Sequence, residues 1–194
     1  MKIQVKIMAI LMIFAAFAVI ACGKLDTTIY AIGDTGPGGG TVFYLKDANG
    51  LHGLEAAPSG WIVVPPDPAS AWSNINSIAI GVTAQGTAIG TGLANSNFII
   101  AQSGHVTSAA KLCRDYAGGG ETDWFLPSKD ELAAMRSALA STSVDRTTYG
   151  FSDDIYWSSS EVDATTASGQ NFYTGDQGNF VKSSTTYVRA IRAF

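Results

Sequence analysis

The stretch DWFLPSKDEL, residues 123–132, joins a short apolar segment to the start signal of a helix. Ser128 and Glu131 have the spacing of a capping box, in which the serine side chain accepts from the amide three residues on and the glutamate side chain accepts from the serine amide. Leu132 and Leu139 follow at helical spacing and predict a helix with one buried stripe. This structural role accounts for Glu131, so we do not assign it to catalysis.

Patterns on either side of this stretch predict further helices and several strands. Residues 93–101 and 108–116 are expected to be helical, and the Asn49-Gly50 pair favours a hairpin turn. Runs rich in β-branched and aromatic residues predict strands at 41–45, 53–57, 155–159, 171–173, 179–182 and 187–194.

The first 22 residues have the pattern of a bacterial lipoprotein signal. Lys2 and Lys6 precede an apolar run of 15 residues, 7–21, whose small residues lead into Cys22. As a helix the run would extend about 22 Å, which is short of the bilayer's hydrocarbon core of about 30 Å. We therefore expect residues 1–21 to be a cleaved signal peptide and Cys22 to carry the lipid. The alternative is an ordinary secretory signal in which Cys22 is incidental.

Domain organisation follows from this leader. Residues 22–32 are expected to be a lipidated tether and residues 33–194 a single globular domain, held to the membrane through the lipid anchor. Gly23 stands where an aspartate would signal retention at the inner membrane, which favours the outer membrane or the cell surface. The sequence therefore predicts a lipid-anchored protein of the bacterial cell envelope.

The chain without its leader is acidic. Removal of Lys2 and Lys6 leaves 10 basic and 16 acidic residues, a formal net charge of −6. This balance argues against nucleic acid as a partner. Lys182, Arg189 and Arg192 could still form a local basic patch, although we favour scattered, solvated charges.

Four landmarks of the sequence together resemble one bacterial protein family. They are GPGGGTVFY at 36–44, DWFLPSKDEL at 123–132, YWSSSE at 156–161 and VRAIR at 188–192. In order and spacing they are similar to the family named for the C-terminal domain of the collagen-like adhesin Lcl, long known as a domain of unknown function. The resemblance spans residues 33–194. It implies one compact α+β domain related to the C-type lectin and sulfatase-modifying folds, with two main helices beside irregular antiparallel strands.

The resemblance also implies a surface role, since the named family member is an adhesin that binds sulfated polysaccharides. The chain departs from its relatives in three ways. It lacks a collagen stalk and the Glu-Pro-Asn and Trp-Asn-Asp triplets of calcium-dependent lectins, and its domain keeps one cysteine, Cys113, where the copper site of formylglycine-generating enzymes needs a pair. Trimerisation, a calcium-bridged sugar site and formylglycine chemistry are therefore not carried over, and the acidic balance argues against sulfated glycans.

Few residues offer catalytic or metal-binding chemistry. His52 and His105 are the only histidines, and neither has a cysteine or an acidic cluster nearby at metal-ligand spacing. A hydrolase or metal enzyme is therefore the least favoured function, and we expect no catalytic residue, no metal and no cofactor. Cys113 shares a helical face with apolar neighbours and is expected to be buried and inert.

Four acidic side chains could supply oxygen ligands to calcium: Asp153, Asp154, Glu161 and Asp163. Their spacing matches no known calcium loop, so exposed loop acids are the favoured interpretation.

The favoured binding residues lie in the late, turn-rich part of the chain. Tyr173, Asp176, Gln177 and Asn179 combine an aromatic ring, an acid and amides that can stack on and hydrogen-bond to a sugar or a peptide. Solvated turns are the alternative interpretation.

The tryptophan motifs are expected to be structural. Trp124 and Pro127 precede the predicted helix, and Trp157 lies in a predicted strand, so we expect these residues to anchor the core. The sequence as a whole predicts a lipid-anchored binding or adhesion module that recognises a glycan or surface polymer and is not an enzyme. The alternative is an envelope scaffold that contacts other proteins.

Overall fold

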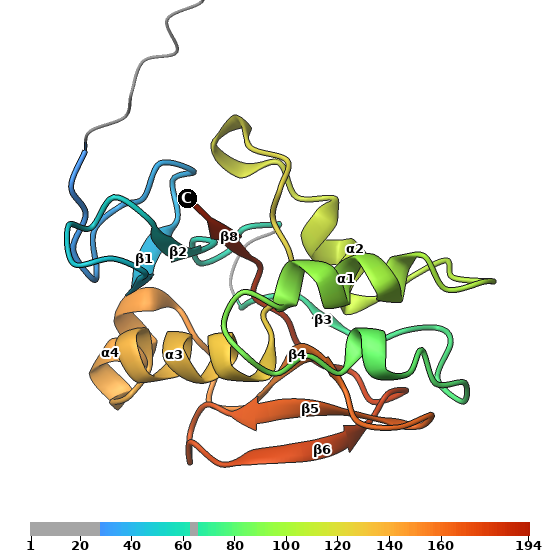
Figure 1. Cartoon of the computed structure of the whole chain (residues 1–194). Coiled ribbons are helices and arrows are strands. Elements are labelled where there is room, and N and C mark those ends of the chain that lie inside the picture. Colours follow the sequence, from blue (N-terminus) through green and yellow to red (C-terminus); the bar gives the residue numbers. More distant parts are fainter. Residues whose placement is uncertain (1–27, 63–65) are drawn as a thin grey trace, which may run out of the picture.

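The computed structural model describes residues 28–62 and 66–194. Within them the chain folds into two sheets and four α-helices that form one compact domain of mixed α and β structure (Figure 1). The predicted signal peptide, the lipidation site Cys22 and the tether up to residue 27 lie outside the described residues.

A small antiparallel sheet contains the first strands and the last one. Its strands are β1 (Thr41–Leu45), β2 (Gly53–Ala56) and β8 (Ile191–Ala193), in the order β1-β2-β8. The turn between β1 and β2 is the predicted one, and Gly50 adopts a φ of 66° there, in the left-handed region that favours glycine.

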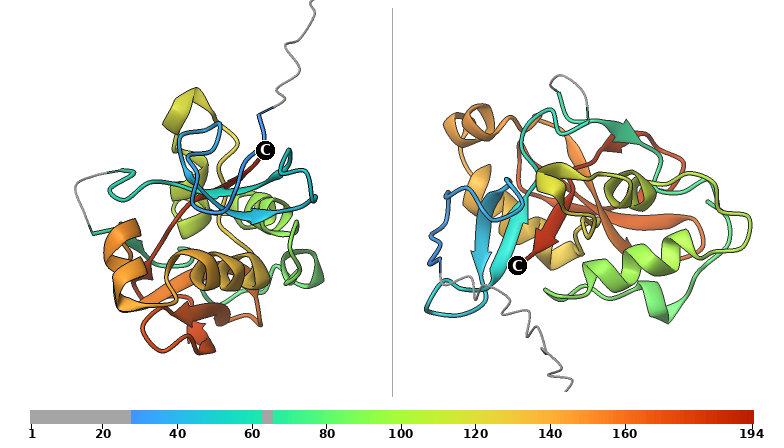
Figure 2. Two further views of the ribbon diagram at one scale, coloured as in Figure 1. Left: turned by 90° about the vertical axis from the view of Figure 1, so that its left-hand side faces the viewer. Right: turned by 90° about the horizontal axis from the view of Figure 1, so that it is seen from above.

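The larger sheet has the strand order β3-β7-β4-β5-β6. Its strands are β3 (Ala69–Ser70), β4 (Ile155–Glu161), β5 (Thr166–Asn171), β6 (Gln177–Val181) and β7 (Thr186–Tyr187). The pairing is antiparallel except between β4 and β7. Strand β6 lies at the edge, and the hairpin β5–β6 lies on the side of the domain opposite β1 and β2 (Figures 1 and 2).

The helices are α1 (Gly92–Ile100), α2 (Ala109–Arg114), α3 (Lys129–Leu139) and α4 (Ser143–Tyr149), with short 3-10 turns η1 (Val82–Ala84) and η2 (Gly118–Gly120). Helix α3 packs against β4 and β5 of the larger sheet and against β1 of the smaller one, so it joins the two sheets. Helices α1 and α2 pack against each other, and α1 also contacts β4.

The predicted capping box is present at the start of α3. The Glu131 amide donates to Ser128 Oγ at 3.3 Å, and the Ser128 amide donates to Glu131 Oε2 at 2.7 Å. Ser128 Oγ also donates to the Ala88 carbonyl at 3.0 Å. Local sequence thus fixes where this helix begins, and the same serine fastens it to a distant loop.

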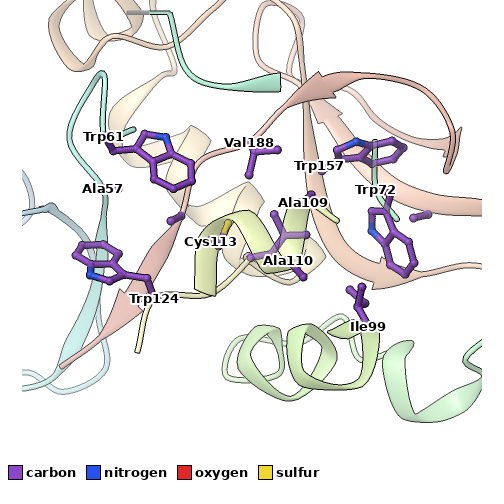
Figure 3. Packing of buried hydrophobic residues seen from close by; sticks show 13 residues of the cluster. Ala57, Trp61, Trp72, Ile99, Ala109, Ala110, Cys113, Trp124, Trp157 and Val188 are labelled. Carbon is purple, nitrogen blue, oxygen red and sulfur yellow. The ribbon is translucent and has the colours of Figure 1, made fainter. Parts of the chain in front are cut away.

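Four tryptophans, of which Trp61 is one, form much of one core cluster, which Figure 3 shows around helix α2. Trp72, Trp124 and Trp157 have no exposed area, and their indole N–H groups donate to the carbonyls of Ser158, Gly118 and Ser70. Cys113 is fully buried among them, and burial raises the pKa of its thiol. A second cluster packs α3 against both sheets.

Two strand predictions are wrong at the residue level. The strand expected at 171–173 ends at Asn171. There the Asn171 side chain accepts hydrogen bonds from the amides of Tyr173 at 2.9 Å and Thr174 at 3.0 Å, and these bonds form a turn. The single strand expected over 187–194 divides between β7 and β8. Arg189 lies between them, and its guanidinium donates to Asp67 Oδ2 at 2.8 Å, while the Val188 amide donates to the Pro68 carbonyl and the Ala190 carbonyl accepts from the Ala57 amide.

The predicted basic residues near the end of the chain form no patch, and two of them are not solvated. Lys182 Nζ lies 2.6 Å from Glu161 Oε1 and both side chains are fully buried. Arg189 is 2 % exposed and pairs with Asp67. Arg192 is mostly covered and is paired with nearby acids. Each of these three positive charges is thus paired with a carboxylate that is distant in the sequence.

Helix α4 was not predicted from the sequence, although it begins with its own capping box at Thr142 and Asp145. The Ser128 box is buried whereas the Thr142 box is exposed, which allows a matched comparison.

We expect Ser128→Ala to destabilise the domain by about 1 to 2 kcal/mol, because it removes a buried helix cap and the hydrogen bond that ties the helix start to the Ala88 carbonyl. Thr142→Ala should cost less, about 0.5 kcal/mol, since water replaces the lost bond. Urea denaturation of both variants measures the difference. Equal midpoints for Ser128→Ala and the wild type would contradict the assigned helix start.

Candidate functional site

The turn between β5 and β6 is tightly closed by its own backbone. The Asn171 amide donates to the Asp176 carbonyl at 2.9 Å, and the Gly175 amide donates to the Asn171 carbonyl at 2.8 Å. Gly175 has a φ of 88°, which an L side chain rarely adopts. The turn is therefore a defined structure rather than a loose loop.

Helix α3 supports this turn from both ends. A Cβ atom added to Gly175 would lie 2.7 Å from Cζ of Arg136, so the guanidinium packs flat against the glycine. At the start of the helix, Gln177 Nε2 donates to the Lys129 carbonyl at 3.2 Å. The hairpin tip is thus fixed to an element that itself joins the two sheets.

An open hollow of about 280 Å³ lies beside the hairpin. Two of the four predicted binding residues, Asp176 and Gln177, line it. They are joined there by Ile155, Asn171, Thr174, Gly178 and Phe180. The structure therefore combines an acid, amides and a hydroxyl with an aromatic ring that is Phe180 rather than the predicted Tyr173.

The other two predicted binding residues, Tyr173 and Asn179, do not line this hollow. Tyr173 is 61 % exposed and its ring lies 5.5 Å from Cζ of Arg146, which also pairs with Asp153. Asn179 is exposed on β6, opposite Ser168 of β5. The sequence placed all four residues in one loop, but the Tyr173 ring lies against Arg146, and Asn179 lies within strand β6, further from the turn than Gln177.

Two further cavities, which sequence analysis missed, flank Phe194 beside the small sheet. One measures about 340 Å³ and is lined by Tyr44, Lys46, His52, Gly53, Leu54, Ile89, Gly90, Ala193 and Phe194. The other measures about 350 Å³ and is lined by Thr28, Tyr30, Pro37, Leu51, His52, Glu121, Arg192 and Phe194. His52 and Phe194 line both. No local pattern signals them, because the walls of each come from at least four separate segments of the chain.

The two histidines have different partners. His52 Nδ1 lies 2.6 Å from Asp47 Oδ2, and this hydrogen bond is the main reason that the pKa of Asp47 is lowered. His105 Nε2 lies 2.8 Å from Ser108 Oγ, and burial, followed by the charge of Lys111, lowers the pKa of His105. One histidine thus contacts a carboxylate and the other a hydroxyl.

The four acids considered for calcium do not gather. Asp153 pairs with Arg146, and Glu161 is buried against Lys182 rather than exposed in a loop, which corrects the favoured interpretation for that residue. Asp163 accepts from the amides of Thr165 and Thr166, and these bonds lower its pKa to about 2. Within residues 28–62 and 66–194 no group of three or more histidine, cysteine or acidic side chains is placed to hold a metal ion.

The landmark residues in the middle of the chain have structural surroundings. Trp124 and Trp157 are in the core, and Pro127 is buried with its carbonyl accepting from the Ser159 amide at 2.7 Å. Glu131 accepts from the amides of Ser128 and Gly90, and burial raises its pKa.

Comparison with known proteins gives a similarity at the level of the fold. No protein-family model matches the chain, and no curated protein matches it. Among solved structures the chain is similar to a fimbrial protein from Bacteroides ovatus ATCC 8483, with 14 % sequence identity and a TM-score of 0.54. The match covers 78 % of this chain and 43 % of the fimbrial protein, so the chain spans less than half the length of that neighbour.

At this identity the similarity concerns the fold. Among the described residues, no helix combines the length and apolar character needed to cross a bilayer. What the comparisons establish is therefore a compact α and β domain whose fold also occurs within a larger fimbrial protein.

Proposed function

We propose that this chain is a lipid-anchored binding or adhesion module of the bacterial cell envelope, outside the inner membrane, and not an enzyme. The signal pattern of residues 1–22 supports secretion and lipid attachment at Cys22. The fold shared with a fimbrial protein supports a surface role. The landmarks shared with the Lcl family support kinship with the C-type lectin and sulfatase-modifying folds.

The hollow beside the β5–β6 hairpin is the observation that carries this proposal. The Asp176 carboxylate offers acceptors for sugar hydroxyls, and Phe180 offers an apolar surface beside it, while Asn171 and Gln177 also hold the turn in shape. The hollow is open, which suits a segment of an extended polymer better than a small enclosed ligand. A glycan or surface polymer is therefore the proposed ligand.

The length of the tether is consistent with this site. From Cys22 to Thr28 the chain can reach at most about 20 Å. The first described residues lie near β1 and β2, and the hairpin lies on the opposite side of the domain (Figures 1 and 2). A domain anchored at Cys22 would thus have the hairpin on the side that faces away from the membrane.

The edge of the larger sheet favours a second candidate function, an envelope scaffold that contacts other proteins. Strand β6 pairs only with β5 among the described strands, so its outer edge has backbone groups available to an extended peptide. Val181, which is 52 % exposed, adds an apolar side chain to that strand.

Replacing Asp176 and Gln177 together by alanine should weaken glycan binding at least about tenfold, because it removes the carboxylate and one amide of the hollow. Asn179→Ala is the matched control, since Asn179 is exposed on the same strand but outside the hollow. The full-length chain in detergent would be screened on a glycan array. Unchanged binding by the double variant would refute this site, and binding to extended peptides alone would favour the scaffold.

Replacing Cys22 by serine should abolish lipid attachment and release the protein from membranes or block its processing. Cys113→Ser is the matched control, because the Cys113 thiol is buried and should leave fractionation unchanged. Membrane fractionation with intact-mass analysis measures both. Identical mass and fractionation for wild type and Cys22→Ser would exclude lipidation at this residue.

A further inference from the structure

The two cavities that flank Phe194 share two rigidly held side chains. Phe194 exchanges backbone hydrogen bonds with Gly53, at 3.0 and 3.1 Å, and its ring stands edge-on to Tyr30 with the ring centroids 5.1 Å apart. A Cβ atom on Gly53 would lie 2.9 Å from Cζ of Phe194, so the ring has its place only because residue 53 is glycine. The aromatic wall is therefore formed before any ligand arrives.

His52 is held in a similar way. Its Nδ1 contacts Asp47 Oδ2, and Asp47 Oδ1 accepts from the Leu51 amide at 3.0 Å. With Nδ1 engaged by the carboxylate, Nε2 is left for a hydrogen bond to a ligand. Since His52 lines both cavities, a ligand in either cavity can contact its side chain.

The two cavities differ in charge. The first is lined by Lys46 and by no aspartate or glutamate, and Lys46 has no ion pair with a side chain among the described residues. In the second, Glu121 Oε2 lies 3.0 Å from Nη2 of Arg192, so the opposite charges there are already paired. Only the first cavity therefore offers a lysine ammonium with no acidic side chain in the lining to pair with it.

We propose that the first cavity is a second ligand site, which takes one sugar ring bearing a carboxylate. The ring packs against Phe194 and Tyr44, its hydroxyls hydrogen-bond to His52 Nε2, and its carboxylate meets the Lys46 ammonium. The cavity of about 340 Å³ lies at the lower end of the range common for small-ligand pockets, which suits a single ring. This site is separate from the β5–β6 hollow and does not depend on it.

Glucuronic acid and glucose are suitable probes, because they differ in one carboxylate. Titrated into the full-length chain in detergent and followed by amide NMR, glucuronic acid should shift resonances of residues 44–54 and 193–194 and bind more tightly than glucose. Lys46→Ala should weaken glucuronic acid binding about tenfold and leave glucose unchanged. Phe194→Leu should weaken both sugars, since it removes the aromatic face.

Lys111→Ala is the control, because Lys111 is an exposed lysine that pairs with Asp115 and does not line the cavity. Lys46 is itself exposed, so its replacement should leave the amide spectrum of the fold intact. Equal affinities for the two sugars, or no shifts at residues 44–54 with either sugar, would overturn the proposal. Loss of hairpin binding in the Asp176 and Gln177 variant has no bearing on this outcome.

Discussion

Buried carboxylates that accept backbone amides hold this domain together. Glu55 accepts from the amides of Gly38 and Gly40 at 2.9 Å, and Glu161 accepts from those of Ile80 and Gly81 at 2.9 and 2.7 Å. Glu131 Oε1 accepts from the Gly90 amide at 2.8 Å and so fixes a third loop. Glu55 and Glu161 are matched by Arg192 and Lys182, which offsets the cost of burying their charge. Each acid ties a segment with little regular structure to a strand or helix.

The proposed ligand sites depend on these attachments. Helix α3 begins at the box that contains Glu131, and the same helix carries Arg136, against which Gly175 of the hairpin packs. Of the two cavities beside Phe194, the first is lined by Gly90, whose amide donates to Glu131, and the second by Arg192, which pairs with Glu55. Because the loops are fixed to the sheets, side chains from distant segments keep their relative positions without a disulfide or a metal ion among the described residues.

Part of the local chemistry was predicted from the sequence, although helix α4 was missed, and the long-range pairing was not predicted. The capping box at Ser128 depends on residues three apart, and it predicted helix α3 correctly. Lys182 and Arg189 looked like surface charges because their acidic partners are 21 and 122 residues away in the chain. For the same reason, only two of the four predicted binding residues line one hollow. Asp176 and Gln177 reach the hollow, but its aromatic ring comes from Phe180, and the cavities at His52 combine segments that no local pattern connects.

Native-state hydrogen exchange measured by NMR tests this account most directly. The loop amides that donate to the buried glutamates are those of Gly38, Gly40, Ile80, Gly81 and Gly90. If the carboxylates hold the loops, these amides should exchange as slowly as those in the ladder between β4 and β5. Exchange of these amides at the rate of unprotected loop residues, while the ladder stays protected, would contradict the central role of the buried acids.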